Sequence, residues 1–137
     1  MEAIQGAVLG VKIKYIDEWT EKRRKNAQIY NEMMENLDIV LPYEASYARH
    51  VYHIYAIRAK KRDILRDFLG KNGVSTGIHY PIPVHLQKAY SFMGLREGSF
   101  PASEKVANEI LSLPMYPELS EEQMGYIAGN IKEFLNS

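Results

Sequence analysis

The spacing of apolar residues predicts a long helix at the start of the chain. From Ala3 to about Leu37 there is no proline, and apolar positions recur every three or four residues, the period of an α-helix. In the first half they form two stripes on different sides of the helix: Ile4, Val8, Val11 and Tyr15 on one, Leu9, Ile13 and Ile16 on the other. A surface helix of a small domain needs one such stripe. The second stripe therefore predicts contact with another protein surface, either a missing large domain or a second subunit.

The rest of the chain alternates short strand-like and helical patterns. We expect strands at Val51–Ala59 and Val74–His79, helices at Arg62–Lys71, Leu86–Phe92 and Ala102–Leu111, an extended SLPMYP segment, and a last helix after the capping box Ser120–Gln123. This order predicts an α+β fold with a small antiparallel or mixed sheet and helices packed on one face. We expect one domain over residues 1–137, with a long helix at 3–37 and an α/β body at 38–137.

Composition excludes several classes of function. The 137 residues are 46% hydrophobic, which is enough for one core. Seventeen basic side chains balance seventeen acidic ones, so neither nucleic acid nor a membrane surface is an expected partner. The chain has no cysteine, which removes disulfides, thiolate zinc sites and cysteine nucleophiles. The first residues show neither a signal peptide nor a membrane span, and we expect a cytoplasmic protein.

The segment HYPIPVH, residues 79–85, brings two histidines and a tyrosine together, side chains that can form hydrogen bonds with a ligand. Its two prolines fix φ and bias the residues before them to extended conformations, so the segment is a stiff loop. Such a loop is either a structural turn or a surface that presents its side chains to a ligand, and spacing alone does not separate the two.

Two other sets of polar residues have simpler explanations. His50 and His53 are three residues apart, but without cysteine or a carboxylate cluster a metal site is not expected. Arg23 and Arg24 can meet a nucleotide phosphate across a dimer, although an exposed helix surface is the favoured interpretation.

Three stretches together resemble the DegT/StrS-type sugar aminotransferases. They are MEAIQGAVLGVKIKYIDEW followed by an Arg-Arg pair, NGVSTGIHYPIPVHLQKAY, and FPASEKVANEILSLPMYPELSEEQ. The resemblance implies the C-terminal small domain of a pyridoxal-phosphate enzyme, in which the large domain binds the cofactor and two subunits form a homodimer. It implies that His79, Tyr80 and His85 line the entrance to the substrate pocket.

The same resemblance places the Schiff-base lysine on polypeptide that precedes Met1. We therefore assign no catalytic, cofactor-binding or metal-binding residue to this chain, and expect it to be inactive alone. The whole enzyme would move an amino group from a donor such as glutamate to a keto-sugar nucleotide. The alternative is a free-standing binding or regulatory module that is not catalytic.

Overall fold

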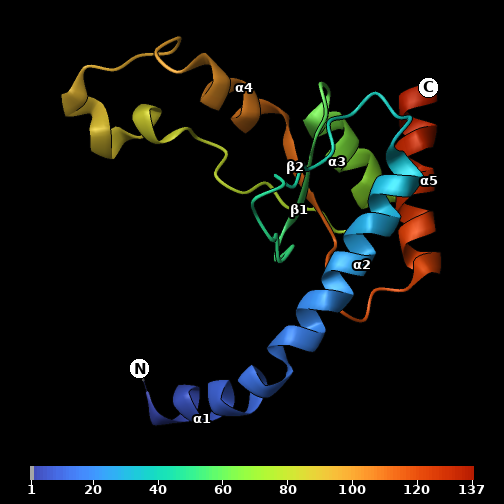
Figure 1. The fold of residues 1–137 in the computed structure, drawn as a ribbon. Helices are drawn as coiled ribbons and strands as arrows, with labels where there is room; N and C mark the ends of the chain where they lie inside the picture. Colours follow the sequence, from blue (N-terminus) through green and yellow to red (C-terminus); the bar gives the residue numbers. More distant parts are fainter. Residues whose placement is uncertain (1) are drawn as a thin grey trace.

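Helices dominate the computed structural model, which describes residues 2–137 (Figure 1). The α-helices are α1 (Ala3–Lys12), α2 (Ile16–Met34), α3 (Arg62–Lys71), α4 (Pro101–Glu109) and α5 (Glu121–Asn136). Strands β1 (Tyr55–Arg58) and β2 (Ile110–Leu113) form an antiparallel sheet, and 3-10 turns occur at η1 (Ile13–Tyr15), η2 (Val84–Leu86) and η3 (Lys88–Met93). The predicted α+β class and the long N-terminal helix are confirmed.

The N-terminal helix differs from its prediction in two details. It ends at Met34 instead of Leu37, because the chain closes a turn there, with the amide of Leu37 donating to the carbonyl of Met34 at 3.1 Å. The tight turn η1 also divides it into α1 and α2, which run in different directions (Figure 1). Helix α2 packs on the body of the protein, whereas α1 buries none of its residues.

The hydrophobic core lies between one face of the sheet and helices α2, α3 and α5 (Figure 1). The register pairs Tyr55 with Leu113 and Ile57 with Leu111, and these four residues are buried. The ring centroid of Tyr30, from α2, lies 4.9 Å from the ring centroid of Tyr55. Alternate strand residues point to opposite faces, so Ser112 lies on the other side of the sheet.

The two strands are not the two that the sequence predicted. The predicted strand 51–59 shortens to β1 because Tyr52 has a positive φ of 47°, which breaks the extended backbone before it. The predicted strand 74–79 is wrong: of this segment only Gly77 pairs, as an isolated bridge with Ser112. Strand β2 instead takes the last residues of the helix predicted at 102–111, because α4 ends at Glu109.

Two local signals are confirmed where they were expected. Helix α3 ends as the Asn72-Gly73 pair predicted: Gly73 has a φ of +74°, and the amide of Val74 donates back to the carbonyl of Leu69 at 2.9 Å. At the start of α5, Ser120 and Gln123 exchange the two hydrogen bonds of a capping box, at 3.0 and 3.2 Å.

Residues 79–109 leave the sheet and return to it, and we call this segment the arm. The helix predicted at 86–92 is two 3-10 turns, because Gln87 between them has extended backbone. In Figure 1 the arm and α1 project from the same side of the body, one at each end, so the molecule is concave between them. None of the helices within residues 2–137 is long and apolar enough to cross a membrane.

Candidate functional site

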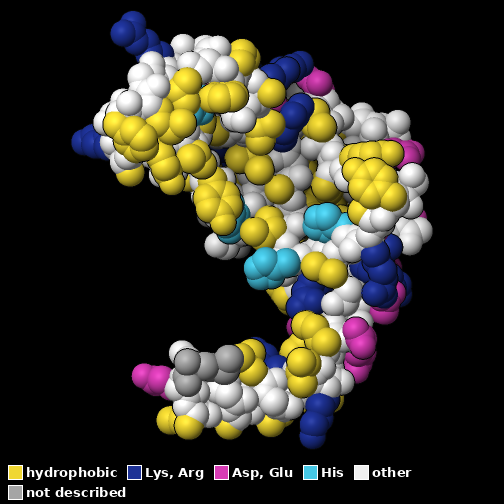
Figure 2. Space-filling model, turned by 60° about the vertical axis from the view of Figure 1, so that its left-hand side comes forward, with side chains coloured by type: hydrophobic (Ala, Val, Ile, Leu, Met, Phe, Trp, Pro, Cys, Tyr) yellow, Lys and Arg dark blue, Asp and Glu magenta, His cyan; other side chains and the backbone are white. Residues whose placement is uncertain are grey.

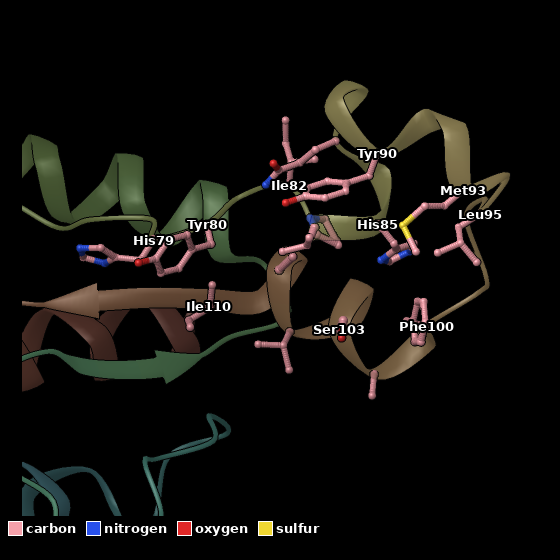
Figure 3. A pocket seen from close by; sticks show the side chains of 16 residues that line it. His79, Tyr80, Ile82, His85, Tyr90, Met93, Leu95, Phe100, Ser103 and Ile110 are labelled. Carbon is pink, nitrogen blue, oxygen red and sulfur yellow. The ribbon is translucent and has the colours of Figure 1, made fainter.

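A large cavity lies along the arm, next to the end of β2 (Figure 3). It has a volume of about 860 Å³ and is lined mainly by apolar side chains. Tyr90, Met93, Leu95 and Phe100 surround its outer end. Residues His79, Tyr80 and His85 all belong to its lining, so the structure brings the three sequence-predicted site residues to one cavity.

His79 occupies the end of the cavity nearest the sheet. Its Nδ1 lies 2.7 Å from the hydroxyl Oγ of Ser112 in β2. The ring passes over Gly77, where an added Cβ would lie 3.3 Å from the Cε1 atom of His79. The ring is thus held on one edge by a buried hydroxyl, while the residue as a whole remains exposed.

Tyr80 is the most open residue of the three, with 84% of its surface exposed. Its φ of +58° is unusual for a residue other than glycine, and it directly precedes Pro81. Such backbone conformations cost energy and are often found at binding sites. In the view of Figure 3 the phenol hydroxyl of Tyr80 is directed toward the side of His79.

His85 is part of the internal structure of the arm. It is only 9% exposed, and its Nε2 lies 2.9 Å from Oε1 of Glu104. Glu104 also accepts hydrogen bonds from the backbone amides of Gly98 and Phe100, at 2.9 to 3.1 Å. The rings of His85 and Phe100 pack edge to face, with their centroids 4.9 Å apart. His85 therefore shapes the cavity wall, and His79 and Tyr80 are the residues available to a ligand.

The backbone amide of Gly98 is the largest cause of a lowered pKa at Glu104, with further contributions from the amide of Phe100 and from His85. Hydrogen bonds to the ionised carboxylate favour its charged form. Glu104 is thus an anion that organises the turn between η3 and α4.

Sequence reasoning did not find Glu104, Ser112 or Gly77. A weak signal existed for Glu104, because an acidic residue in the first turn of a helix that begins at Pro101 often accepts from nearby backbone amides. No local signal existed for Ser112, since it is 33 residues from His79 in the sequence.

Two of the other polar candidates, Arg24 and His50, have structural roles. Arg24 donates from Nη1 to Glu44 Oε1 at 2.7 Å and to the carbonyl of His50 at 2.6 Å, which fastens the loop before β1 to α2. The Nδ1 atom of His50 accepts from the amide of Tyr52 at 2.8 Å. In the part of the chain that the structure describes, no three His, Asp or Glu side chains come together as metal ligands would.

Comparison with known proteins identifies the class. Residues 1–132 match the model of the DegT/DnrJ/EryC1/StrS aminotransferase family, and the chain belongs to this family. It is 45% identical, over 98% of its length, to the pleiotropic regulatory protein of Geobacillus stearothermophilus. It is 35% identical, also over 98% of its length, to the dTDP-3-amino-3,6-dideoxy-alpha-D-galactopyranose transaminase of Aneurinibacillus thermoaerophilus.

A solved structure has the same fold. The crystal structure of DesV from S. venezuelae, in complex with a ketimine intermediate, superposes with a TM-score of 0.92 at 35% identity over 97% of this chain. The chain spans 37% of the Geobacillus protein and 36% of both the Aneurinibacillus transaminase and DesV. It therefore matches about a third of each of these proteins.

The residues of the cavity do not fit the cofactor that the family implies. Pyridoxal phosphate forms an imine with a lysine, and its pyridine nitrogen needs an acidic partner. Every lysine of residues 2–137 is exposed, and the cavity lining contains neither lysine nor an acidic residue. We assign no step of a cofactor reaction to these side chains, and the expectation that the chain alone binds no cofactor stays a prediction.

Proposed function

We propose that this chain is the C-terminal small domain of a pyridoxal-phosphate-dependent sugar-nucleotide aminotransferase, and that it supplies one wall of the substrate pocket. The observation that carries the proposal is a family match along nearly the whole chain, combined with coverage of about a third of the relatives. The complete enzyme would transfer an amino group from a donor such as glutamate to a keto-sugar nucleotide. We place it in the cytoplasm because a chain without cysteine suits a reducing compartment.

The chemistry of the cavity supports a binding role for the end nearest the sheet. His79 and Tyr80 offer polar atoms that can bond hydroxyl or phosphate oxygens of a sugar nucleotide. The stiff HYPIPVH loop holds them in place, and the His85–Glu104 pair fixes the wall behind them. None of these groups is assigned the central proton transfer, which belongs to the lysine of the large domain in the family that this chain resembles.

Helix α1 supports the proposal that another protein surface completes the structure. Leu9 of α1, Ile13 of η1 and Ile16 at the start of α2 are 53%, 69% and 45% exposed, and the other stripe, from Ile4 to Tyr15, is exposed as well. Apolar surface of this kind is usually covered in a functional protein. We propose that the large domain or a second subunit covers it, and that the complete enzyme is a homodimer.

A chimeric enzyme tests the function. The matching third of the Aneurinibacillus transaminase is replaced by this chain, and the purified chimera is assayed for amino-sugar formation, with cofactor absorbance as the check on folding. We expect activity from the chimera. The isolated chain mixed with pyridoxal phosphate should show no aldimine absorbance. A stable aldimine on the isolated chain, or a cofactor-loaded chimera without activity, would contradict the proposal.

One comparison favours a second candidate, a regulatory module without catalytic activity. The relative with 45% identity is named a pleiotropic regulatory protein. In this alternative α1 contacts a regulatory partner and the cavity serves only to shape the arm. A folded, cofactor-loaded chimera that does not transfer amino groups would favour this candidate over the first.

A further inference from the structure

Ser112 occupies a position where three backbone segments meet. It faces Ala56 of β1 in the register of the sheet, and it exchanges two backbone hydrogen bonds with Gly77 on its other side, at 2.7 and 3.0 Å. Its side chain lies on the face of the sheet opposite the core, where a serine would ordinarily be exposed to solvent. Instead Ser112 is only 5% exposed, and Nδ1 of the His79 imidazole lies 2.7 Å from its hydroxyl.

The glycine opposite Ser112 makes room for this arrangement. A Cβ at Gly77 would lie 3.3 Å from Cε1 of His79, closer than most Cβ contacts, and 3.7 Å from its Nδ1, an ordinary van der Waals distance. Gly77 has no φ in the left-handed region, so backbone conformation does not require glycine there. A side chain at this position would therefore have to displace the imidazole by a few tenths of an ångström.

The hydrogen bond between Ser112 and His79 also selects a tautomer. Within residues 2–137 the Ser112 hydroxyl has no hydrogen-bond partner other than His79 Nδ1, at 2.7 Å. If Nδ1 carried the proton, it would donate to Oγ and the buried O–H of Ser112 would have no acceptor, which is costly. If Ser112 donates to Nδ1, its O–H is satisfied and the proton of the neutral ring is on Nε2.

We infer that Ser112 is a positioning residue that holds neutral His79 as the Nε2–H tautomer, so that the ring offers a hydrogen-bond donor to an acceptor oxygen of a ligand in the cavity. The inference about the ring stands on this chain alone. The identity of the ligand as a sugar nucleotide rests on the proposed function. Gly77 contributes by leaving the ring its place above the sheet.

Nitrogen NMR of the 137-residue chain tests the tautomer directly. Long-range correlations between the ring protons and nitrogens of His79, assigned with a His79→Gln variant, distinguish Nε2–H from Nδ1–H. We expect the Nε2–H pattern in the parent chain and a shift toward averaged nitrogen signals in Ser112→Ala. Ser112→Thr keeps a hydroxyl and should restore the parent pattern.

Ser103→Ala is the matched control, because Ser103 lines the same cavity and has no hydrogen bond to His79 among the described residues. It should leave the His79 signals unmoved. An Nδ1–H pattern in the parent chain, or unchanged His79 signals in Ser112→Ala, would overturn the inference. Circular dichroism of each variant shows whether the fold persists, and Ser112→Thr supplies the comparison if Ser112→Ala unfolds.

The chimera described above measures the consequence for binding. Loss of the ordered donor should raise KM for the sugar nucleotide by roughly 2- to 10-fold with little effect on kcat, the size of one net hydrogen bond. Because Ser112 acts through His79, Ser112→Ala should add nothing in a His79→Gln background. An equal effect in both backgrounds contradicts the inference. An inactive chimera with the expected NMR pattern would instead count against the proposed function alone.

Discussion

Glu104 joins two parts of the arm that are distant in sequence. Its carboxylate accepts from the backbone of Gly98 and Phe100 in the turn before α4, and it meets His85 of η2. Only 13% of its side chain is exposed, and 8% of that of His85. A carboxylate held by several donors with little access to water contributes to stability only while it is ionised.

We therefore expect acid to weaken the arm through Glu104. The pKa of Glu104 is lowered from its ordinary value of 4.5, so its contribution is complete above that value and is lost as the pH falls through the lower pKa of the folded state. Urea unfolding at a series of pH values measures this. Glu104→Gln should be less stable than the parent near neutrality, and the difference should shrink below pH 4.5.

Glu97→Gln is the control for this experiment, because it removes one negative charge from the exposed turn without breaking a hydrogen bond among the described residues. The pKa of Glu44 is also lowered, chiefly by the hydrogen bond from Arg24, so protonation of Glu44 in acid also weakens the fold. This effect is present in the stability curves of both the parent and Glu104→Gln. Parallel stability curves for the parent and Glu104→Gln would show that the carboxylate does not hold the arm.

At the scale of the element, the sequence predicted helices better than strands for a physical reason. Helix α3 has the predicted bounds Arg62–Lys71, because the residues that end it, Asn72 and Gly73, directly follow it in the sequence. A strand forms only by pairing with another strand, and β2 pairs with β1, which lies more than fifty residues earlier in the sequence. The segment before His79 had strand-like residues but only one place for pairing, at Gly77.

The candidate site divides in the same way. His79, Tyr80 and His85 lie in one stiff loop, and the family resemblance of that loop predicted them together. The groups that fix the two histidines, Ser112 and Glu104, are 33 and 19 residues away. Their roles depend on sheet register and on the return of the arm, which no local pattern encodes.

Two glycines of the helical elements should respond in opposite directions to alanine. Gly129 lies exposed in the interior of α5 with no atom within 4 Å of an added Cβ, so Gly129→Ala should stabilise the chain by about 0.5–1 kcal/mol. Gly73 has the positive φ of a helix end, so Gly73→Ala should destabilise it by about 1 kcal/mol. Chemical denaturation measures both, and changes of the same sign would contradict the assigned backbone conformations.

Asn26 connects helix α2 to the segment between β2 and α5. It is buried, and its Nδ2 donates to the carbonyl of Tyr116 at 2.9 Å, ninety residues along the chain. Asn26→Ala removes this hydrogen bond, while the carbonyl of Tyr116 still accepts from the amide of Leu119 at 3.3 Å, so the free energy of unfolding should fall by about 0.5–1.5 kcal/mol. Asn36→Ala is the comparison, because Asn36 is exposed and, among residues 2–137, its side chain bonds only its neighbour Glu35. Equal losses in the two variants would show that the Asn26 contact is not a structural tie.

At the scale of the whole molecule, two features project from a well-packed body. The arm and α1 stand out at its two ends, and the space-filling view shows hydrophobic side chains on the surfaces of both (Figure 2). The arm is held by the His85–Glu104 pair and returns to the sheet through α4. Helix α1 has no such support, since none of its ten residues is buried. The body thus has its own hydrophobic core, whereas the apolar residues of α1 are exposed.

Amide hydrogen exchange should reveal this difference and identify what covers α1. Helices shorter than about 12–15 residues are marginal in water without tertiary packing, so the amides of Ala3–Lys12 should exchange rapidly in the dilute chain. The amides of α2 near Tyr30 and Met34 lie in the core and should exchange slowly. Slow exchange throughout α1 in a dilute monomer would contradict the need for another surface.

The same measurement separates the two occupants proposed for α1. If a second copy covers the stripe of Leu9, Ile13 and Ile16, protection of α1 should rise with the concentration of the chain itself. If the large domain covers it, protection should be independent of chain concentration and should appear in the chimera. Ile13→Glu places a charge on the apolar stripe and should abolish the protection in either case, because the carboxylate would have to be buried without a partner. Lys14→Gln also changes the charge by one, but Lys14 is exposed and lies outside the apolar stripe, so this variant should leave the protection intact. Protection that survives Ile13→Glu would show that the stripe is not the contact surface.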